Sequence, residues 1–133
     1  MMSIDKVALI YIKQRKVLST RSRGKDAWYL PGGKREGTET DEECLTREIK
    51  EELNVDLTVG SLIPMGVFEA QAHGKAEGVV VQMTCYSAEF DGVPTATSEI
   101  EDIAWLDSSV DLASLSPVDQ IIFAHLNDHN LIS

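Results

Sequence analysis

The residues best suited to chemistry are three glutamates, Glu48, Glu51 and Glu52, in the segment Arg-Glu-Ile-Lys-Glu-Glu at residues 47–52. In an α-helix, at about 100° per residue, the three side chains fall within one arc of about 100°, so their carboxylates can converge beside the helix. Clustered carboxylates repel one another unless a cation lies among them. Ligand sets made only of oxygen favour Mg²⁺, Mn²⁺ or Ca²⁺. The spacing therefore indicates a divalent-metal site, with a plain solvated helix face as the alternative.

Two glycines and a second acid–base pair stand close to this segment. Gly32 and Gly33 lack side chains, so their backbone can approach a ligand closely. Arg47 follows Glu39 by eight residues, and a charge-assisted hydrogen bond between them would join the preceding loop to the helix. We therefore expect the loop and the helix to act as one unit.

Basic residues in the first third of the chain could hold phosphate. Residues 1–35 carry nine Lys/Arg and two Asp/Glu, whereas residues 36–52 carry eight acids and two bases. Arg21, Arg23 and Lys34 could bind phosphate oxygens. Arginine would do so through paired N–H groups of its guanidinium, and lysine through the point charge of its ammonium group. A basic region beside a cluster of metal-binding carboxylates is the minimum equipment for phosphate-ester chemistry.

The overall composition narrows the partners and the setting. The chain has 133 residues, 43% of them hydrophobic, and a formal net charge of −10. This charge argues against a nucleic-acid duplex or an anionic membrane as partner, and no apolar run approaches the ~20 residues of a membrane span. We expect one domain over residues 1–133, in the cytoplasm because no signal-peptide pattern opens the chain. The two cysteines, Cys44 and Cys85, give neither a disulfide framework nor a zinc site.

Hydrophobic periodicity and turn residues indicate the elements that must position these side chains. Strands are expected over the apolar or alternating segments 7–12, 17–20, 28–30, 55–59, 65–68, 79–90 and 103–106. Pro31, Gly32 and Gly33 are expected to break any regular element. Strands before and after a central helix, with a further helix near the C-terminal end, predict a mixed sheet covered by helices.

The central helix is expected over residues 40–54. Thr38 or Thr40 can cap its start, and Asn54 can end it in the left-handed conformation. Its apolar stripe comprises Leu45, Ile49 and Leu53. The last helix is expected to open with Ser116 as its cap and Pro117 at its first position. Its buried stripe is predicted to be Val118, Ile121, Ile122 and Leu126.

The acidic segment and its lead-in together resemble a known family. Gly33, Glu39 and the segment 47–55 match the Nudix box, G-x5-E-x7-R-E-U-x-E-E-x-G-U, in which U is aliphatic. One position departs, because Asn54 stands where glycine is usual, and asparagine tolerates the left-handed conformation. The lead-in at residues 28–34 and the order of strands along the chain also resemble the family. Fixed residues at this many fixed spacings make the match specific.

The resemblance implies a Nudix-type α/β/α sandwich with a mixed β-sheet, and hydrolysis of a nucleoside diphosphate linked to another group, X. It assigns Mg²⁺ or Mn²⁺ to Glu48, Glu51, Glu52 and the carbonyl of Gly33. It assigns Glu39 and Arg47 to orienting the loop and the helix. The metal would polarise the diphosphate and stabilise charge on the leaving phosphate oxygen.

Sequence markers of individual Nudix subgroups narrow the choice of substrate. The proline typical of ADP-ribose hydrolases is missing from residues 68–71, and the tyrosine of diadenosine polyphosphate hydrolases is missing at residues 72–73. The remaining match is to MutT-type enzymes, which convert a (d)NTP to a (d)NMP and pyrophosphate. Nucleotide sugars, dinucleoside polyphosphates, a catalytically silent nucleotide-binding module and a Ca²⁺ buffer stay as alternatives. The expected partner is a small nucleotide, and a homodimer is left open.

The general base is expected outside the box, because the box glutamates must hold metal. The loop before the strand at 103–106 offers three acids, and in MutT-type relatives a loop glutamate shortly before the tryptophan strand can take this role. Glu99 matches that placement best, six residues before Trp105. Glu101, a box glutamate or no loop acid at all are the alternatives.

Other candidate residues are expected to have structural rather than catalytic roles. His125 and His129 have i, i+4 spacing but no third ligand, so helix packing is expected. His73 is expected in a solvated loop. Trp28 could stack on a base or join the core.

Overall fold

The computed structural model describes residues 2–72 and 74–133. Its main sheet has four strands in the order β4-β1-β7-β6. These are β1 (Met2–Leu9), β4 (Gly32–Lys34), β6 (Ile63–Gln71) and β7 (Val79–Ser87). β1 is parallel to β7 and the other two pairings are antiparallel, so the sheet is mixed, as the sequence predicts.

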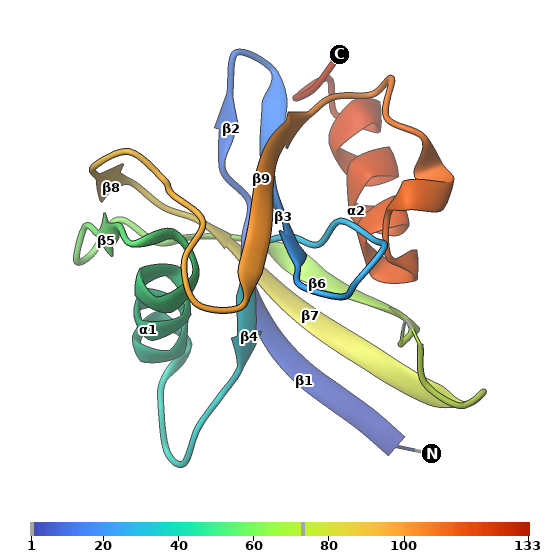
Figure 1. Cartoon of the computed structure of the whole chain (residues 1–133), viewed down its shortest axis with the longest axis horizontal. Coiled ribbons are helices and arrows are strands. Elements are labelled where there is room, and N and C mark those ends of the chain that lie inside the picture. Colours follow the sequence, from blue (N-terminus) through green and yellow to red (C-terminus); the bar gives the residue numbers. More distant parts are fainter. Residues whose placement is uncertain (1, 73) are drawn as a thin grey trace.

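Shorter strands form two further sheets beside the main one (Figure 1). β2 (Ile12–Lys13), β3 (Lys16–Ser22) and β9 (Ile100–Leu106) form an antiparallel sheet in that order. β5 (Asp56–Leu57) pairs with β8 (Phe90–Asp91).

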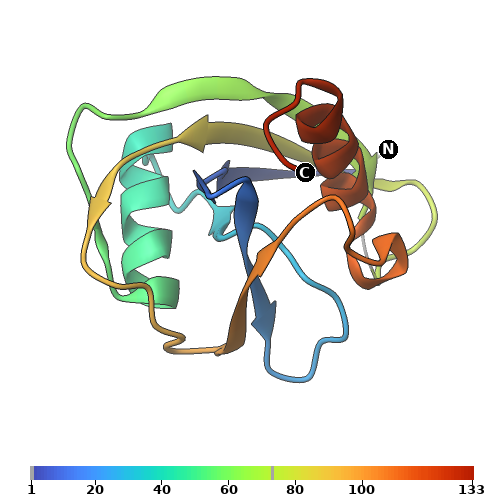
Figure 2. The ribbon, with the colours of Figure 1, turned by 90° about the horizontal axis from the view of Figure 1, so that it is seen from above.

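Two helices lie on opposite sides of the strands, as seen from above in Figure 2. They are α1 (Asp41–Leu53) and α2 (Pro117–Asp128), and a short 3₁₀-helix, η1 (Leu112–Ser114), precedes α2. Alternation along β1 explains the two layers, because Val7 and Leu9 pack in the cluster with α1 whereas Ala8 and the following Ile10 pack in the cluster with α2. The predicted mixed sheet between helices is confirmed.

The ends of α1 follow from local chemistry. The Thr40 hydroxyl accepts a hydrogen bond from the backbone N–H of Glu43, and the Glu43 carboxylate accepts one from the N–H of Thr40. Asn54 ends the helix with φ 56° and ψ 38°, the left-handed conformation that is usually left to glycine. The box therefore keeps its helix end although its glycine is replaced.

The structure differs from the prediction between Trp28 and Lys34. No strand forms at residues 28–30, where Trp28 and Tyr29 make isolated bridges only. A strand forms instead at Gly32–Lys34, where the sequence predicts a break, because β1 offers it an antiparallel partner. Tertiary pairing thus overrides local propensity at the start of the site.

Three further expectations about burial and strand length are wrong. Val59 is 86% exposed, because the strand at 55–59 shrinks to the two residues of β5. The strand at 79–90 divides into β7 and β8, because the chain leaves β1 to pair with β5. Ile121 is 46% exposed, and Phe123 takes its place in the core. Within the described residues, no helix is long and apolar enough to cross a membrane.

Candidate active site

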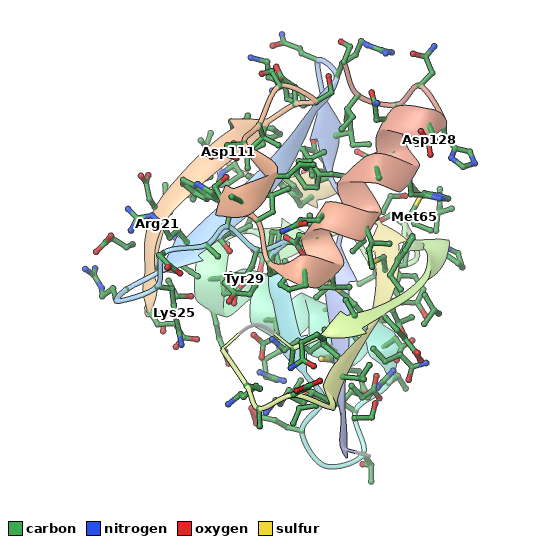
Figure 3. All side chains as sticks on the ribbon, turned by 90° about the vertical axis from the view of Figure 1, so that its right-hand side faces the viewer. Arg21, Lys25, Tyr29, Met65, Asp111 and Asp128 are labelled. Carbon is green, nitrogen blue, oxygen red and sulfur yellow. The ribbon has the colours of Figure 1, made fainter. Side chains whose placement is uncertain are left out.

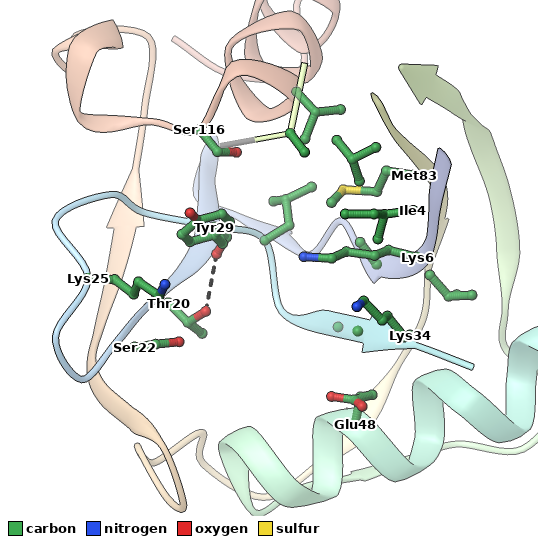
Figure 4. Close-up of a pocket in the computed structure, with 18 of the residues that line it drawn as sticks. Ile4, Lys6, Thr20, Ser22, Lys25, Tyr29, Lys34, Glu48, Met83 and Ser116 are labelled. Carbon is green, nitrogen blue, oxygen red and sulfur yellow. Dashed lines mark hydrogen bonds between the residues drawn. The ribbon is translucent and has the colours of Figure 1, made fainter. Parts of the chain in front are cut away.

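A cavity of about 500 Å³ opens between β1, β4, the N-terminal end of α2 and the box helix α1 (Figure 4). Glu48 and Glu52 of α1 line one wall of it. Lys6 of β1 and Lys34 of β4 lie beside these acids, and Tyr29 lies across the cavity. The register explains the placement, because Lys6 and Lys34 are direct partners in the β1–β4 pair.

Gly33 brings α1 close to β4. A Cβ atom at this position would lie 2.5 Å from the carboxyl carbon of Glu48, which is closer than real Cβ contacts allow. Glycine therefore lets the Glu48 carboxylate lie against the strand backbone. The carbonyl oxygen of Gly33 accepts a 3.7 Å hydrogen bond from the thiol of Cys44, a buried residue of α1.

Glu52 is the most buried acid of the box, with 8% of its surface exposed. The backbone N–H of Gly32 donates a hydrogen bond of 3.0 Å to one of its carboxylate oxygens. Burial, reinforced by the nearby charges of Glu48 and Glu99, raises the pKa of Glu52 to about 8. Burial also raises the pKa of Glu48. Two desolvated carboxylates side by side make an electrostatically costly arrangement that a cation would relieve.

Arg47 holds the loop before α1. Its guanidinium forms a fork with Glu39, at 2.7 Å to one oxygen and 2.9 Å to the other. It also donates to the backbone carbonyl of Lys34 at 3.1 Å and to Glu48 at 2.8 Å. The hydrogen bonds from Arg47 hold the pKa of Glu39 at about 2, so this pair stays ionised at neutral pH.

The carboxylates fit a hard divalent cation, although their arrangement is less convergent than the sequence predicts. Among the described residues, no three acidic, histidine or cysteine side chains lie close enough together to hold a metal ion as they stand. The side chain of Glu51 is 52% exposed, and its carboxylate lies 3.4 Å from the guanidinium of Arg47. The positive charge of Arg47 reduces the repulsion between Glu51 and the other box glutamates. Glu48 and Glu52 nevertheless line one wall together, and burial raises the pKa of both acids. Carboxylate oxygens are the ligands that hard divalent cations favour.

The predicted phosphate-binding residues separate in the structure. Arg23 and Lys34 line the cavity. Arg21 does not: it pairs with Glu101 at 2.7 Å and lies over the Trp28 ring at 5.7 Å, on the β9 side of β3 (Figure 3). The structure therefore brings two of the three predicted basic residues to the cavity that Glu48 and Glu52 line.

Lys6 is a cation of the cavity that sequence reasoning missed. Burial, together with the charge of Lys34, lowers its pKa, while the carboxylates of the site oppose that change. Its ammonium lies 5.9 Å from the centre of the Tyr29 ring, and no salt bridge to it is found among the described residues. The signal was present in the alternation of β1, which places Ile4, Lys6 and Ala8 on one face.

Asp119 is a second missed residue. It has no exposed surface, and one carboxylate oxygen accepts a 2.8 Å hydrogen bond from the N–H of Leu30. Its other oxygen has no hydrogen-bond partner within the described part of the chain. Burial raises the pKa of Asp119 to about 7. The sequence shows it only as an acid in the first turn of α2, next to Ser116, Pro117 and Val118 of the cavity wall.

The two loop glutamates have different surroundings. Glu99 lines the cavity, and its backbone carbonyl accepts a 2.8 Å hydrogen bond from the N–H of Arg23. Glu101 lies outside the cavity lining, paired with Arg21. Of the two, only Glu99 is near enough to Glu52 to influence its pKa.

His125 and His129 do not line the cavity, whereas Cys44 packs against the Gly33 carbonyl beside it. His125 contacts the ring of Phe68, with centroids 5.3 Å apart, and the ring of His129, with centroids 4.1 Å apart. Cys44 and Cys85 are buried and free. His73 lies outside the described residues.

Comparison with known proteins gives concordant matches. A family model of the NUDIX domain matches residues 4–122. The m7GpppN-mRNA hydrolase of Saccharomyces cerevisiae is 33% identical over 93 residues, which make up 69% of this chain and 9% of the yeast protein. The 8-oxo-dGTP diphosphatase of Proteus vulgaris is 39% identical over 59 residues, 44% of this chain and 50% of that protein. The chain thus spans half or less of the length of these relatives.

A solved structure extends the match to nearly the whole chain. The solution structure of the E. coli ORF135 protein superposes with a TM-score of 0.71 at 26% sequence identity. The match covers 97% of this chain and 94% of the E. coli chain. Fold and box therefore agree on one family.

Proposed function

Because the chain belongs to the NUDIX domain family, whose hydrolases act on nucleoside diphosphate derivatives, we propose that it converts a nucleoside triphosphate to a nucleoside monophosphate and pyrophosphate. The observation that carries the proposal is one cavity with two kinds of wall. Glu48 and Glu52 line one side and Tyr29 lies across from Glu48, whereas Lys6 and Lys34 line the β1–β4 side, with the Lys6 ammonium 5.9 Å from the centre of the Tyr29 ring. These groups suit a charged chain of phosphates attached to a flat, less polar nucleoside.

The carboxylate wall is the proposed metal site. Nudix hydrolases use divalent metal ions, and oxygen-only donors favour Mg²⁺ or Mn²⁺. We assign Glu48, Glu52 and the Gly33 carbonyl to the cation, with Glu51 joining from the same helix. When bound, the cation supplies positive charge that polarises the phosphoric anhydride.

The basic residues position the phosphates. Lys6 and Lys34 line the same cavity as Glu48 and Glu52, whose charges act on the pKa of Lys6, and Arg23 lines it from the loop after β3. A partly desolvated ammonium interacts more strongly with an anion than an exposed one does. Lys6 is therefore the strongest candidate for holding the substrate's phosphates in place, and Arg23 and Lys34 assist it.

Glu99 is the proposed general base. It lines the cavity but lies outside the box, so in this scheme it is not a metal ligand and its carboxylate takes a proton from the attacking water. The hydrogen bond from the N–H of Arg23 to its backbone carbonyl fixes the loop beside the phosphate-binding residues. Arg47 and Glu39 hold the loop and α1 in register but do not contact substrate in this scheme.

A substrate panel tests the proposal. The purified chain with Mg²⁺ would be incubated separately with the common ribo- and deoxyribonucleoside triphosphates, a UDP-sugar, ADP-ribose and a dinucleoside polyphosphate, and products would be separated by ion-exchange chromatography. The expected result is monophosphate and pyrophosphate from at least one triphosphate, with less turnover of the other classes. Faster turnover of a nucleotide sugar or dinucleoside polyphosphate would replace the triphosphate assignment. No turnover of any compound would favour a nucleotide-binding module.

A further inference from the structure

A second cavity, of about 550 Å³, shares no lining residue with the first. Its lining residues come from the β2–β3 hairpin, from β8 with the loop that follows it, and from β9; Figure 1 shows where these strands lie. Its lining contains three aromatic side chains, Tyr11, Phe90 and Trp105, and two lysines, Lys13 and Lys16. Nothing in the proposed hydrolysis uses any of these residues.

The aromatic side chains form one continuous group. The rings of Tyr11 and Phe90 have centroids 4.3 Å apart, and those of Tyr11 and Trp105 have centroids 6.0 Å apart. Trp105 remains 37% exposed, and Val93, which also lines the cavity, is 80% exposed. Exposed apolar surface beside an aromatic group is a usual mark of a binding site. Such a wall favours a flat aromatic ligand that can stack on the rings.

The two lysines add a charge that calls for an anion. Lys13 and Lys16 are direct cross-strand partners in the β2–β3 hairpin, and like charges in opposed positions destabilise a sheet pair. No salt bridge is found for either lysine within residues 2–72 and 74–133, although Lys16 contributes to a lowered pKa of Asp107. An anion bound between the two ammonium groups would remove the repulsion.

The hairpin turn is held in a conformation that keeps this pair in place. Gln14 and Arg15 both have positive φ, 53° and 64°, which is unfavourable for residues other than glycine, asparagine and aspartate. The Arg15 guanidinium compensates by donating to the side chain of Ser133 and to both the carbonyl and side-chain oxygens of Asn130, at distances of 2.8 to 3.0 Å. Hydrogen bonds to the C-terminal segment thus hold the hairpin and occupy the Arg15 guanidinium. Lys13 and Lys16 are the basic residues of the hairpin that line the cavity.

We propose that this second cavity binds a small aromatic anion of the nucleoside monophosphate class, with the base on the aromatic group and the phosphate between Lys13 and Lys16. Stacking on exposed aromatic side chains and neutralisation of phosphate by lysine are the two interactions that such a ligand needs. A long nucleic acid is disfavoured, because the chain carries a net charge of −10 around two local positive charges.

The test is an NMR titration of ¹⁵N-labelled protein with adenosine 5′-monophosphate, which has no phosphoric anhydride for the enzyme to cleave. The expected result is a saturable shift of the Trp105 indole N–H and of the backbone amides of residues 13–16 and 92–93. Any signal from the catalytic cavity appears separately, at the amides of residues 32–34, which line it. The double variant Lys13→Gln/Lys16→Gln should weaken binding at Trp105 about tenfold and leave nucleotide hydrolysis unchanged. Lys50→Gln, which removes an exposed lysine from another surface, is the matched control and should leave binding unaltered.

Three outcomes would overturn the proposal. Shifts confined to the catalytic cavity would show that the second cavity binds nothing of this class. Equal affinity for adenosine and its monophosphate, or an unchanged affinity in the double variant, would show that the phosphate group does not contribute to binding. A single-stranded oligonucleotide that binds far more tightly than the mononucleotide would replace a small ligand by a nucleic acid. A Trp105→Leu variant gives an independent check, because it should abolish stacking without changing charge.

Discussion

Glu52 shows how a single residue can be both unfavourable for the fold and suited to the site. Its carboxyl is nearly inaccessible to water and lies close to two other acids, so its pKa rises to about 8. Without a cation it therefore carries a proton at neutral pH. A divalent cation would displace that proton and gain an anionic ligand already fixed by the N–H of Gly32.

The two loop glutamates allow a matched comparison of the general base. Glu99→Gln should lower kcat by about 10²- to 10³-fold and flatten the acid limb of the pH–rate profile, because the proton acceptor is lost. Glu101→Gln should have a small effect, since Glu101 is paired with Arg21 away from the cavity. The measurement is kcat against pH for both variants at saturating Mg²⁺. Similar behaviour of the two variants would move the base to the box.

Replacing Lys6 by an apolar residue should stabilise the fold and weaken substrate binding. Lys6→Met removes a partly desolvated charge, so we expect the free energy of unfolding to rise by about 1 kcal/mol. The same variant should raise KM about tenfold, because the phosphates lose their most buried cation. Urea denaturation and steady-state kinetics measure the two effects, and Lys6→Arg is the charge-preserving control. A less stable variant with an unchanged KM would show that Lys6 is structural.

Residue types and spacing predict the box residues of the candidate site but not the whole site. The box glutamates and the Arg47–Glu39 pair follow from helical periodicity and spacing. Lys6 and Asp119 do not, because their importance comes from burial, which depends on strands and helices that meet from distant parts of the chain. Arg21 shows the reverse case, since a nearby acid on β9 draws it away from the phosphates.

At the scale of elements, helices were more predictable than strands. Helix α1 begins and ends where its caps, Thr40 and Asn54, indicate, because capping is a local interaction. Strand β4 has a sequence that disfavours a strand and exists because β1 pairs with it. The lengths of β5 and β7 likewise depend on pairing partners, which single-segment periodicity does not contain.

Arg47 acts between elements, because it joins the loop after β4 to α1. Arg47→Ala should lower the melting temperature by about 5 °C together with activity, since the fork to Glu39 and the hydrogen bond to the Lys34 carbonyl are lost. Arg47→Lys keeps the charge but not the fork. Its melting temperature should therefore lie between those of the wild type and Arg47→Ala. Differential scanning calorimetry gives the answer. An unchanged melting temperature with a raised KM would show instead that Arg47 contacts substrate.

At the scale of the molecule, charge is separated by region. The chain as a whole is strongly acidic, yet cations gather at both cavities, Lys6 and Lys34 at one and Lys13 and Lys16 at the other. An acidic exterior repels polyanions, whereas the local cations attract small ones. This distribution agrees with a small nucleotide as substrate.

The stability of the whole molecule should depend on pH through Asp119. Its folded-state pKa of about 7 lies above the ordinary 3.8, so the folded state binds more protons between those values. Its contribution to stability is complete below pH 3.8 and is lost as pH rises through about 7. Asp119→Asn keeps an oxygen for the Leu30 N–H and should flatten the decline in unfolding free energy between about pH 4 and 7. Chemical denaturation at several pH values measures this, and parallel wild-type and variant curves would contradict it.

The most direct test of the account compares Mg²⁺-dependent triphosphate hydrolysis by the wild type and Glu52→Gln. The glutamine keeps an oxygen for the Gly32 N–H, so the fold should persist, which circular dichroism would verify. We predict that the wild type releases monophosphate and pyrophosphate, and that Glu52→Gln loses turnover by at least about 10²-fold at every Mg²⁺ concentration. Wild-type turnover by Glu52→Gln at saturating Mg²⁺ would contradict the assignment of this carboxylate to the metal, and with it the proposed mechanism.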